Sequence, residues 1–238
     1  MTEATTTLKQ QDKKYSETVI QMMRSQAYRE LAAAQMFGHG LQFVPDIKSL
    51  KFMAWHIQEE TEHYIAVAQL YQQHTGESVE PWVKERLQEK PIPFSSSWLE
   101  LGVAQWLYDR GGFWQLQEYE NCSWEPYRTI IGKIIKEERG HQSLGARIAV
   151  QLCQDAENRA EAQKIFAKWL RQGLLSFGRP HNEGNRYAIE VGLKKRDSAE
   201  VMKDFIDDIR EDVKATGLEW PSREELGVEL PEDIDWSL

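Results

Sequence analysis

Two short segments of the sequence repeat one pattern, in which a glutamate is followed three residues later by a histidine. The segments are EETEH, which contains Glu60 and His63, and EERGH, which contains Glu138 and His141. Residues three apart on an α-helix lie on the same face, so each pair can reach a common point. A carboxylate and an imidazole that converge there form half of a metal site. One such pair is usually solvated, but two copies on two long helices favour a metal site.

A helical bundle that binds two metal ions needs one further carboxylate from each of two other helices. Glu30 is the candidate on the first helix. It lies in an alanine-rich apolar stretch, where burying an acid is costly unless a metal or another partner compensates the charge. On the third helix, Asp109 continues the predicted face of Trp98 and Gln105. Glu100 is the alternative, but it lies beside the predicted helix start, where the helix dipole favours an acid. The predicted ligands are Glu30, Glu60, His63, Asp109, Glu138 and His141.

The types of these six side chains indicate which metal they would bind. Four carboxylates and two imidazoles make an oxygen-rich set that suits two hard or borderline ions. Structural zinc sites are instead tetrahedral and usually rich in sulfur. Four carboxylates also offset the charge of two divalent ions, which lowers the cost of burying the cluster. We therefore predict two iron ions, and the set also fits manganese or a mixed Mn/Fe pair.

Apolar periodicity predicts the helices that must position these ligands. Apolar residues recur mostly at spacings of three and four, whereas the alternation typical of strands is nearly absent. Asp46 is a plausible N-cap and Gly76 a plausible helix end. The expected helices cover about 15–40, 46–74, 95–121, 124–154 and 156–177, with a shorter one at about 198–215.

These elements predict an all-α protein, namely a ferritin-like four-helix bundle with additional C-terminal helices and an irregular tail. The connection over about 76–95 contains three prolines and is long for a bundle. We expect residues 1–14 to be a disordered lead and 15–215 to form the helical domain. Residues 216–238 are expected to be a tail that packs on this domain.

Composition restricts the function classes and the location. The net charge of −9 argues against non-specific binding to nucleic acid or to an anionic membrane, which requires a basic face. No apolar run approaches the roughly 20 residues needed to span a bilayer, and no signal peptide is visible. Cys122 and Cys153 match neither a disulfide framework nor a zinc motif. We expect a cytoplasmic protein whose nine tryptophans mostly fill helix interfaces.

With the six ligands placed, the sequence resembles the phenylacetic acid catabolic protein family of the ferritin-like di-iron superfamily, which includes the catalytic component of phenylacetyl-CoA epoxidase. The segments that carry the resemblance are QEETEH at 58–63, SSSWLELGVAQWLYD at 95–109, KEERGHQSLG at 136–145, LLSFGRP at 174–180 and DIDW at 233–236. The resemblance implies that the same six residues bind iron. It also implies a di-iron monooxygenase that uses O₂ as co-substrate to hydroxylate or epoxidise an organic molecule, either an aromatic compound or an acyl-CoA thioester.

The resemblance further implies partners, namely an electron-donating reductase and either a sister ferritin-like subunit or a second copy of the chain. Two departures weaken the link to a CoA substrate. His56 stands where the epoxidase component has a lysine, and no clear basic cluster marks a site for a polyanionic thioester; the pairs Arg24/Arg29 and Arg179/Arg186 are the candidates. The alternatives to an oxygenase are an iron-binding ferroxidase and a non-catalytic ferritin-like partner subunit.

Overall fold

A computed structural model describes residues 8, 11–232, 234 and 236 of the chain. The chain divides into two compact units: residues 1–94 with 123–130, and residues 95–122 with 131–238. The single helical domain predicted over 15–215, with a tail over 216–238 packed on it, stays a prediction. Most of the disordered lead predicted over 1–14 lies outside the described residues.

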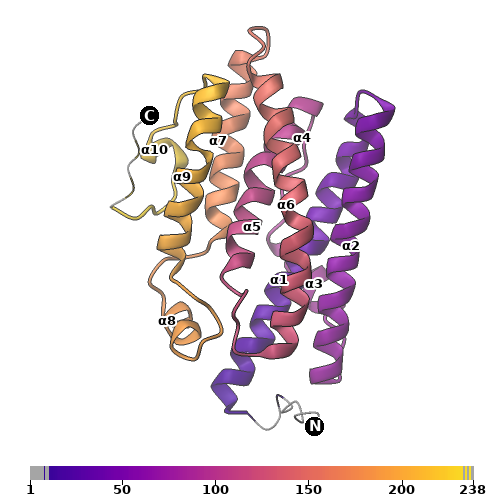
Figure 1. The fold of residues 1–238 in the computed structure, drawn as a ribbon, viewed down its shortest axis with the longest axis vertical. Helices are drawn as coiled ribbons and strands as arrows, with labels where there is room; N and C mark the ends of the chain where they lie inside the picture. The colour runs from indigo at the N-terminus through magenta and orange to yellow at the C-terminus, as the bar shows by residue number, and fades with distance from the viewer. Residues whose placement is uncertain (1–7, 9–10, 233, 235, 237–238) are drawn as a thin grey trace. The chain divides into compact units, whose positions relative to one another are not determined.

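The first unit is built on two long helices that pack side by side, α1 and α2 (Figure 1). Helix α1 spans Lys13–Gly40 and α2 spans Ile47–Thr75, with a short 3₁₀ turn, η2, at Leu41–Phe43 between them. Both helices match the predicted ranges to within two residues.

The N-cap of α2 explains why its start could be predicted. The side chain of Asp46 accepts hydrogen bonds from the backbone N–H groups of Lys48 and Ser49, each at 2.9 Å. These bonds satisfy two donors that the first turn of a helix leaves without partners. At the other end, Gly76 adopts a φ of 80° and ends the helix in the left-handed conformation that glycine tolerates best.

The predicted proline-rich connection over 76–95 contains a helix, α3 at Glu80–Glu89, so the prediction was wrong there. Pro81 lies in the first turn of α3, where its missing N–H costs nothing and its fixed φ suits the helix. Helix α3 packs against α1 within the first unit.

The second unit contains the remaining helices. Helix α7 packs against α4, η3 and α5, and α9 packs against α5. The first six residues of α6 are grouped with the first unit. The elements are α4 (Trp98–Ala104), η3 (Gln105–Asp109), α5 (Arg110–Gln117), α6 (Glu125–Cys153), α7 (Arg159–Ser176), α8 (Glu183–Glu190), α9 (Ser198–Thr216) and α10 (Arg223–Leu226).

Helices α6, α7 and α9 lie where the sequence predicts them, whereas the short helices α8 and α10 were not predicted. The residues that the structure describes form helices and no strand, which confirms the predicted all-α, ferritin-like fold class. Within the same residues, no helix combines the length and the apolar character needed to cross a bilayer.

The predicted third helix is interrupted by a π-helical segment, η3, at Gln105–Asp109. A π-helix hydrogen-bonds from i to i+5, so the reasoning that placed Asp109 on the face of Trp98 and Gln105 assumed the wrong periodicity. Asp109 is nevertheless buried, with 6% of its surface exposed. Single π-turns inside α-helices occur frequently at functional sites.

Two glycines allow neighbouring helices to approach this segment closely. A Cβ atom on Gly145 of α6 would lie 3.0 Å from the backbone nitrogen of Trp106, and one on Gly173 of α7 would lie 3.1 Å from the backbone oxygen of Leu107. Both neighbours are backbone atoms, which cannot move aside as a flexible side chain can. The π-helix is therefore held between α6 and α7 by direct backbone packing.

Candidate metal centre

Three predicted ligands meet in the first unit. Glu30 of α1 and the pair Glu60 and His63 of α2 offer ligand atoms that all lie within 4.8 Å of one another. A carboxylate oxygen of Glu30 lies 3.5 Å from Nδ1 of His63. All three residues are buried, with 2–4% of their surface exposed. In the EETEH segment Glu60 is therefore the inward glutamate, whereas Glu62 is exposed.

Two further buried polar residues, which the ligand prediction did not include, hold these carboxylates. The side-chain amide of Gln26 donates a hydrogen bond to Oε1 of Glu30. Nε2 of His56 lies 3.0 Å from Oε1 of Glu60. Each partner precedes its carboxylate by four residues, and this spacing on one helix face is the signal by which the sequence could have revealed them.

The second unit carries the other three predicted ligands. Glu138 and His141 both lie on α6, and a carboxylate oxygen of Glu138 is 3.6 Å from Nδ1 of His141. His141 is fully buried and Glu138 is 6% exposed. Asp109 is the last residue of η3. Each unit therefore supplies one Glu-x-x-His pair and one further buried carboxylate.

The chemistry of these side chains fits a metal centre. Each unit buries two predicted carboxylate ligands, none more than 6% exposed, and one predicted imidazole ligand. Burying ionised carboxylates costs several kcal/mol each unless opposite charge compensates them. For Glu30, the interactions within the described residues are with Gln26 and His63. Two divalent cations would supply the compensating charge, and the oxygen-rich donors suit iron or manganese.

Glu100, the alternative acid on the third helix, is also buried but has a different role. Ser96 donates to its Oε2 from the backbone N–H at 2.8 Å and from the hydroxyl at 2.6 Å. Lys168 and Trp169 donate to its Oε1, the latter at 3.0 Å. Burial raises the pKa of Glu100, but these hydrogen bonds outweigh it and hold the pKa below its usual range. Glu100 is therefore a structural anchor between α4 and α7.

Replacing this anchor should lower stability in a pH-dependent way. We expect Glu100→Gln to reduce the free energy of unfolding at pH 7 by about 2 kcal/mol, because hydrogen bonds to a charged acceptor are lost. Since the folded-state pKa is depressed, the contribution is present above the unfolded pKa of glutamate and disappears as the pH falls through the folded pKa. Urea unfolding at neutral pH and at a pH below the folded pKa measures this effect. The matched control is Glu89→Gln, which removes an exposed pair with Arg86 and should cost at most about 1 kcal/mol.

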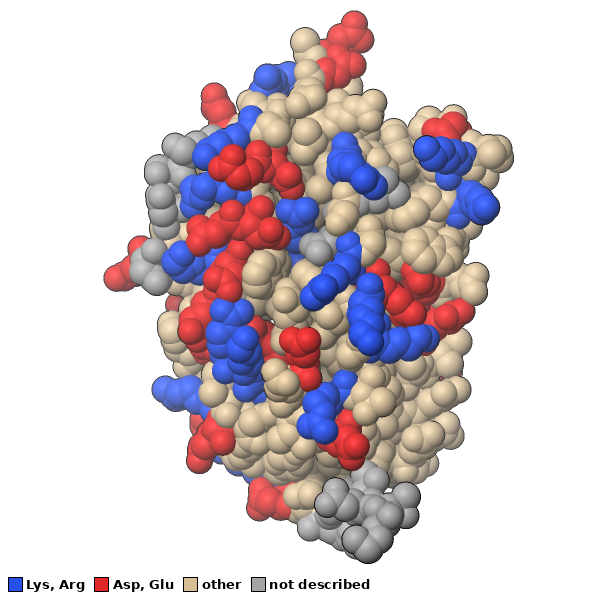
Figure 2. All heavy atoms as spheres, in the orientation of Figure 1, with Lys and Arg blue, Asp and Glu red and all other residues tan. Residues whose placement is uncertain are grey.

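The candidate arginines for a CoA substrate include one that is already engaged. Arg24 donates to the hydroxyl of Tyr71 from Nε at 3.1 Å and from Nη2 at 2.9 Å, and its guanidinium lies 5.7 Å from the ring centre of Trp82. Arg24 therefore has a packing role within the first unit. On the face drawn in Figure 2, Lys and Arg side chains alternate with Asp and Glu, and no broad basic area is visible.

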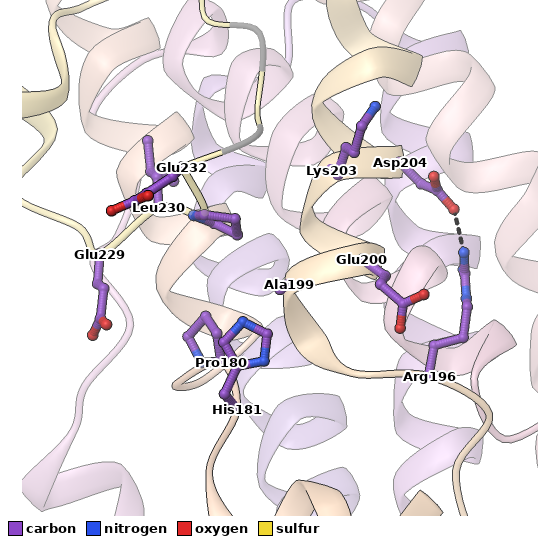
Figure 3. A pocket seen from close by; sticks show the side chains of 11 residues that line it. Pro180, His181, Arg196, Ala199, Glu200, Lys203, Asp204, Glu229, Leu230 and Glu232 are labelled. Carbon is purple, nitrogen blue, oxygen red and sulfur yellow. Dashed lines mark hydrogen bonds and ion pairs between the residues drawn. The ribbon is translucent and has the colours of Figure 1, made fainter.

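A cavity of about 760 Å³ in the second unit lies beside α9, and none of the predicted ligands lines it. Its lining carries both signs of charge. Figure 3 shows Arg196 reaching Asp204, with which it forms a hydrogen bond of 2.6 Å, while Glu200 and Lys203 lie along the same helix. This internal pairing of charge gives the cavity no preference for an anionic ligand.

Comparisons with known proteins point to one family. The model of the family described as "Phenylacetic acid catabolic protein" matches residues 1–229. A curated protein of Escherichia coli strain K12, the A component of 1,2-phenylacetyl-CoA epoxidase, is 22% identical over 241 residues. That alignment covers 93% of this chain and 76% of the relative.

Proposed function

This chain belongs to the phenylacetic acid catabolic protein family, and on this premise we propose that it is a di-iron oxygenase that uses O₂ to hydroxylate or epoxidise an organic substrate. One observation carries the proposal. Glu30, Glu60 and His63 are buried and offer ligand atoms within 4.8 Å of one another. The second unit repeats the chemistry with another Glu-x-x-His pair and Asp109.

In this proposal six residues hold two ions, with iron preferred over manganese. Two bound ferrous ions would supply the electrons for O₂ activation. The chain contributes ligand geometry and charge: four carboxylates neutralise two divalent ions, and the two imidazoles complete the set. The proposed ligands are Glu30, Glu60, His63, Asp109, Glu138 and His141.

Residues behind the proposed ligands orient them. Gln26 holds one oxygen of Glu30 through its amide, which leaves the other oxygen directed at His63. His56 holds one oxygen of Glu60 in the same way. Such support fixes the direction of each carboxylate before a metal arrives, which raises affinity.

Removing this support should weaken metal binding without removing a ligand. We expect His56→Ala to lower iron affinity about 10- to 100-fold, because Glu60 is then free to turn away. Phe37 and Phe52 pack around the imidazole, with ring centres 4.3 and 6.0 Å from it, so His56→Gln is the variant that retains a donor and most of the volume. Equilibrium titration with ferrous iron under anaerobic conditions measures both variants. Unchanged affinity in His56→Ala would contradict the supporting role.

For the substrate we propose an acyl-CoA thioester or a related aromatic acid derivative. The support is the name of the relative from E. coli, which is that of a 1,2-phenylacetyl-CoA epoxidase. Because that relative is named as one component of a larger enzyme, we also propose that this chain works with a sister ferritin-like protein and with a reductase that delivers electrons.

The experiment for the activity supplies iron, a chemical reductant and ¹⁸O₂ to the purified protein. We expect O₂ consumption that depends on iron, and incorporation of one labelled oxygen atom into phenylacetyl-CoA or a related thioester. Consumption of O₂ with deposition of ferric iron and no labelled product would favour a ferroxidase. No iron-dependent consumption at all would favour a non-catalytic partner role.

A further inference from the structure

Aromatic side chains form a continuous row in the second unit, from the π-helix to the C-terminal tail. The ring of Trp106 in η3 stacks on Phe166 of α7, with centroids 5.8 Å apart and planes at 19°. Phe166 meets Trp220 edge-on at 6.0 Å, and Trp220 lies 4.9 Å from Trp236. The row therefore joins three tryptophans that are far apart in the sequence, with one phenylalanine between the first two.

The row leads from the interior to the surface. Trp106 and Phe166 are fully buried, whereas Trp220 and Trp236 are half-buried. At the inner end, Trp106 lies three residues before Asp109 in the same π-helix. Asp109 is a proposed iron ligand, so the inner end of the row and one proposed ligand share the same short π-helix.

Two indole N–H groups of this row lack an acceptor among the described residues, as does that of Trp124 outside the row. Buried tryptophans usually place this group against an acceptor, because leaving it unsatisfied costs about 1–3 kcal/mol. Within the described part of the chain, Nε1 of Trp106 and Nε1 of Trp220 are buried and have no acceptor. At the outer end of the row the indole does find one, since Trp236 donates to the carbonyl of Pro221 at 2.7 Å.

An acceptor matters when an indole loses an electron, because the oxidised ring becomes acidic and passes its proton to any base in reach. The neutral radical that remains is trapped in place. Nε1 of Trp106 and Nε1 of Trp220 have no such base among the described residues, which slows the loss of the proton. The oxidised indole can then be reduced by an electron from the next indole of the row.

We infer that the row Trp106–Phe166–Trp220–Trp236 conducts electrons inward, and that these electrons reduce an oxidised metal centre when no organic substrate is bound. The inference rests on the proposed function. With metal bound, Trp106 would give one electron to the oxidised centre. Trp220 would then reduce Trp106 across Phe166, and Trp236 would reduce Trp220. A soluble reductant such as a thiol or ascorbate then restores Trp236. For every electron that reaches the centre, one electron is taken from the soluble reductant, and Phe166 serves as contact without being oxidised.

Mapping of oxidised tryptophans tests this route. The chain is loaded anaerobically with two ferrous ions and exposed to O₂ without organic substrate or reductant, with catalase present, and its peptides are analysed by mass spectrometry. We expect oxidised products at Trp220 and Trp236 to exceed those at Trp82 several-fold. Trp82 of α3 is half-buried and lies outside the row, so it is the internal control.

Substitutions within the row supply the decisive comparison. Trp106→Phe should bring oxidation at Trp220 and Trp236 down to the level at Trp82. Trp220→Phe leaves the inner end intact and should move oxidation to Trp106, which keeps the inference testable if Trp106→Phe does not fold. Trp82→Phe should leave the pattern in the row unchanged.

Two results would overturn the inference. One is the same oxidation at Trp220 and Trp236 in the original chain and in Trp106→Phe. The other is a pattern that follows exposure alone, with the largest yield at Trp55, which is 46% exposed. Iron content and O₂ consumption are measured in every sample. A failure of the proposed function therefore shows as missing iron or missing consumption, whereas a failure of the row shows as an unchanged oxidation pattern in an active sample.

Discussion

The chain with Glu60→Ala is expected to bind far less than the about two irons per chain expected of the original protein. Glu60 is 2% exposed and contributes to the buried group with Glu30 and His63, so its loss removes a ligand and leaves the buried charge of Glu30 without a tightly bound cation. His141→Ala should have the same effect from the second unit. Iron is measured by colorimetric assay after anaerobic loading and desalting.

The matched control for this prediction is Glu62→Ala on the same helix. Glu62 is exposed and accepts a hydrogen bond from Gln58 at 2.8 Å, so its removal should leave about two irons per chain. Circular dichroism of each variant establishes that the helices are retained. Full iron content in both Glu60→Ala and His141→Ala would refute the proposed ligands.

A single methyl group on Gly145 is expected to lower the free energy of unfolding by about 2 kcal/mol. The added Cβ of Gly145→Ala would lie 2.8 Å from Cγ of Gln105 and 3.0 Å from the backbone nitrogen of Trp106, so α6 would have to move away from η3. Because α6 carries Glu138 and His141 and η3 carries Asp109, iron affinity should fall together with stability. Urea unfolding and iron titration measure the two effects.

The control lies on the same helix. Gly132 has nothing within 4 Å of the position of an added Cβ, so Gly132→Ala should stabilise the helix by about 0.5–1 kcal/mol. If Gly145→Ala were as stable as Gly132→Ala, the close approach of α6 to the π-helix would not be a feature of the folded protein.

The long helices could be predicted because their apolar residues recur at the period of an α-helix. At α2 the capping side chain of Asp46 also marked the start. Helix α3 escaped prediction because Pro81 was interpreted as part of a connection, although proline is favoured in the first turn of a helix. The short helices α8 and α10 present too few residues for an apolar period to be recognised.

The candidate site was predictable where its residues follow the period of an α-helix. The spacing of Glu60 and His63 places both on one face, and the structure brings both to Glu30. The π-helix at Asp109 was not predictable, because the apolar pattern over Gln105–Asp109 is read with the period of an α-helix, whereas a π-helix bonds from i to i+5. Burial of Asp109 was therefore inferred correctly from the wrong periodicity.

The interactions that support the ligands depend on three-dimensional contacts that a sequence does not display. The spacing of Gln26 to Glu30 and of His56 to Glu60 permits contact, but the same spacing is common on solvated helix faces. Burial of both partners is what distinguishes these pairs. The anchoring of Glu100 by Lys168 and Trp169 joins residues that are nearly 70 positions apart, and only the packing of α4 against α7 reveals it.

The most direct test of the metal centre is a crystal structure of the iron-loaded protein with anomalous diffraction recorded at the iron edge. We predict two anomalous peaks about 4 Å apart. One Glu-x-x-His pair should lie at each peak, and the carboxylates of Glu30 and Asp109 should complete the ligand set. A single peak, or iron bound at residues other than these six, would contradict the proposed di-iron centre.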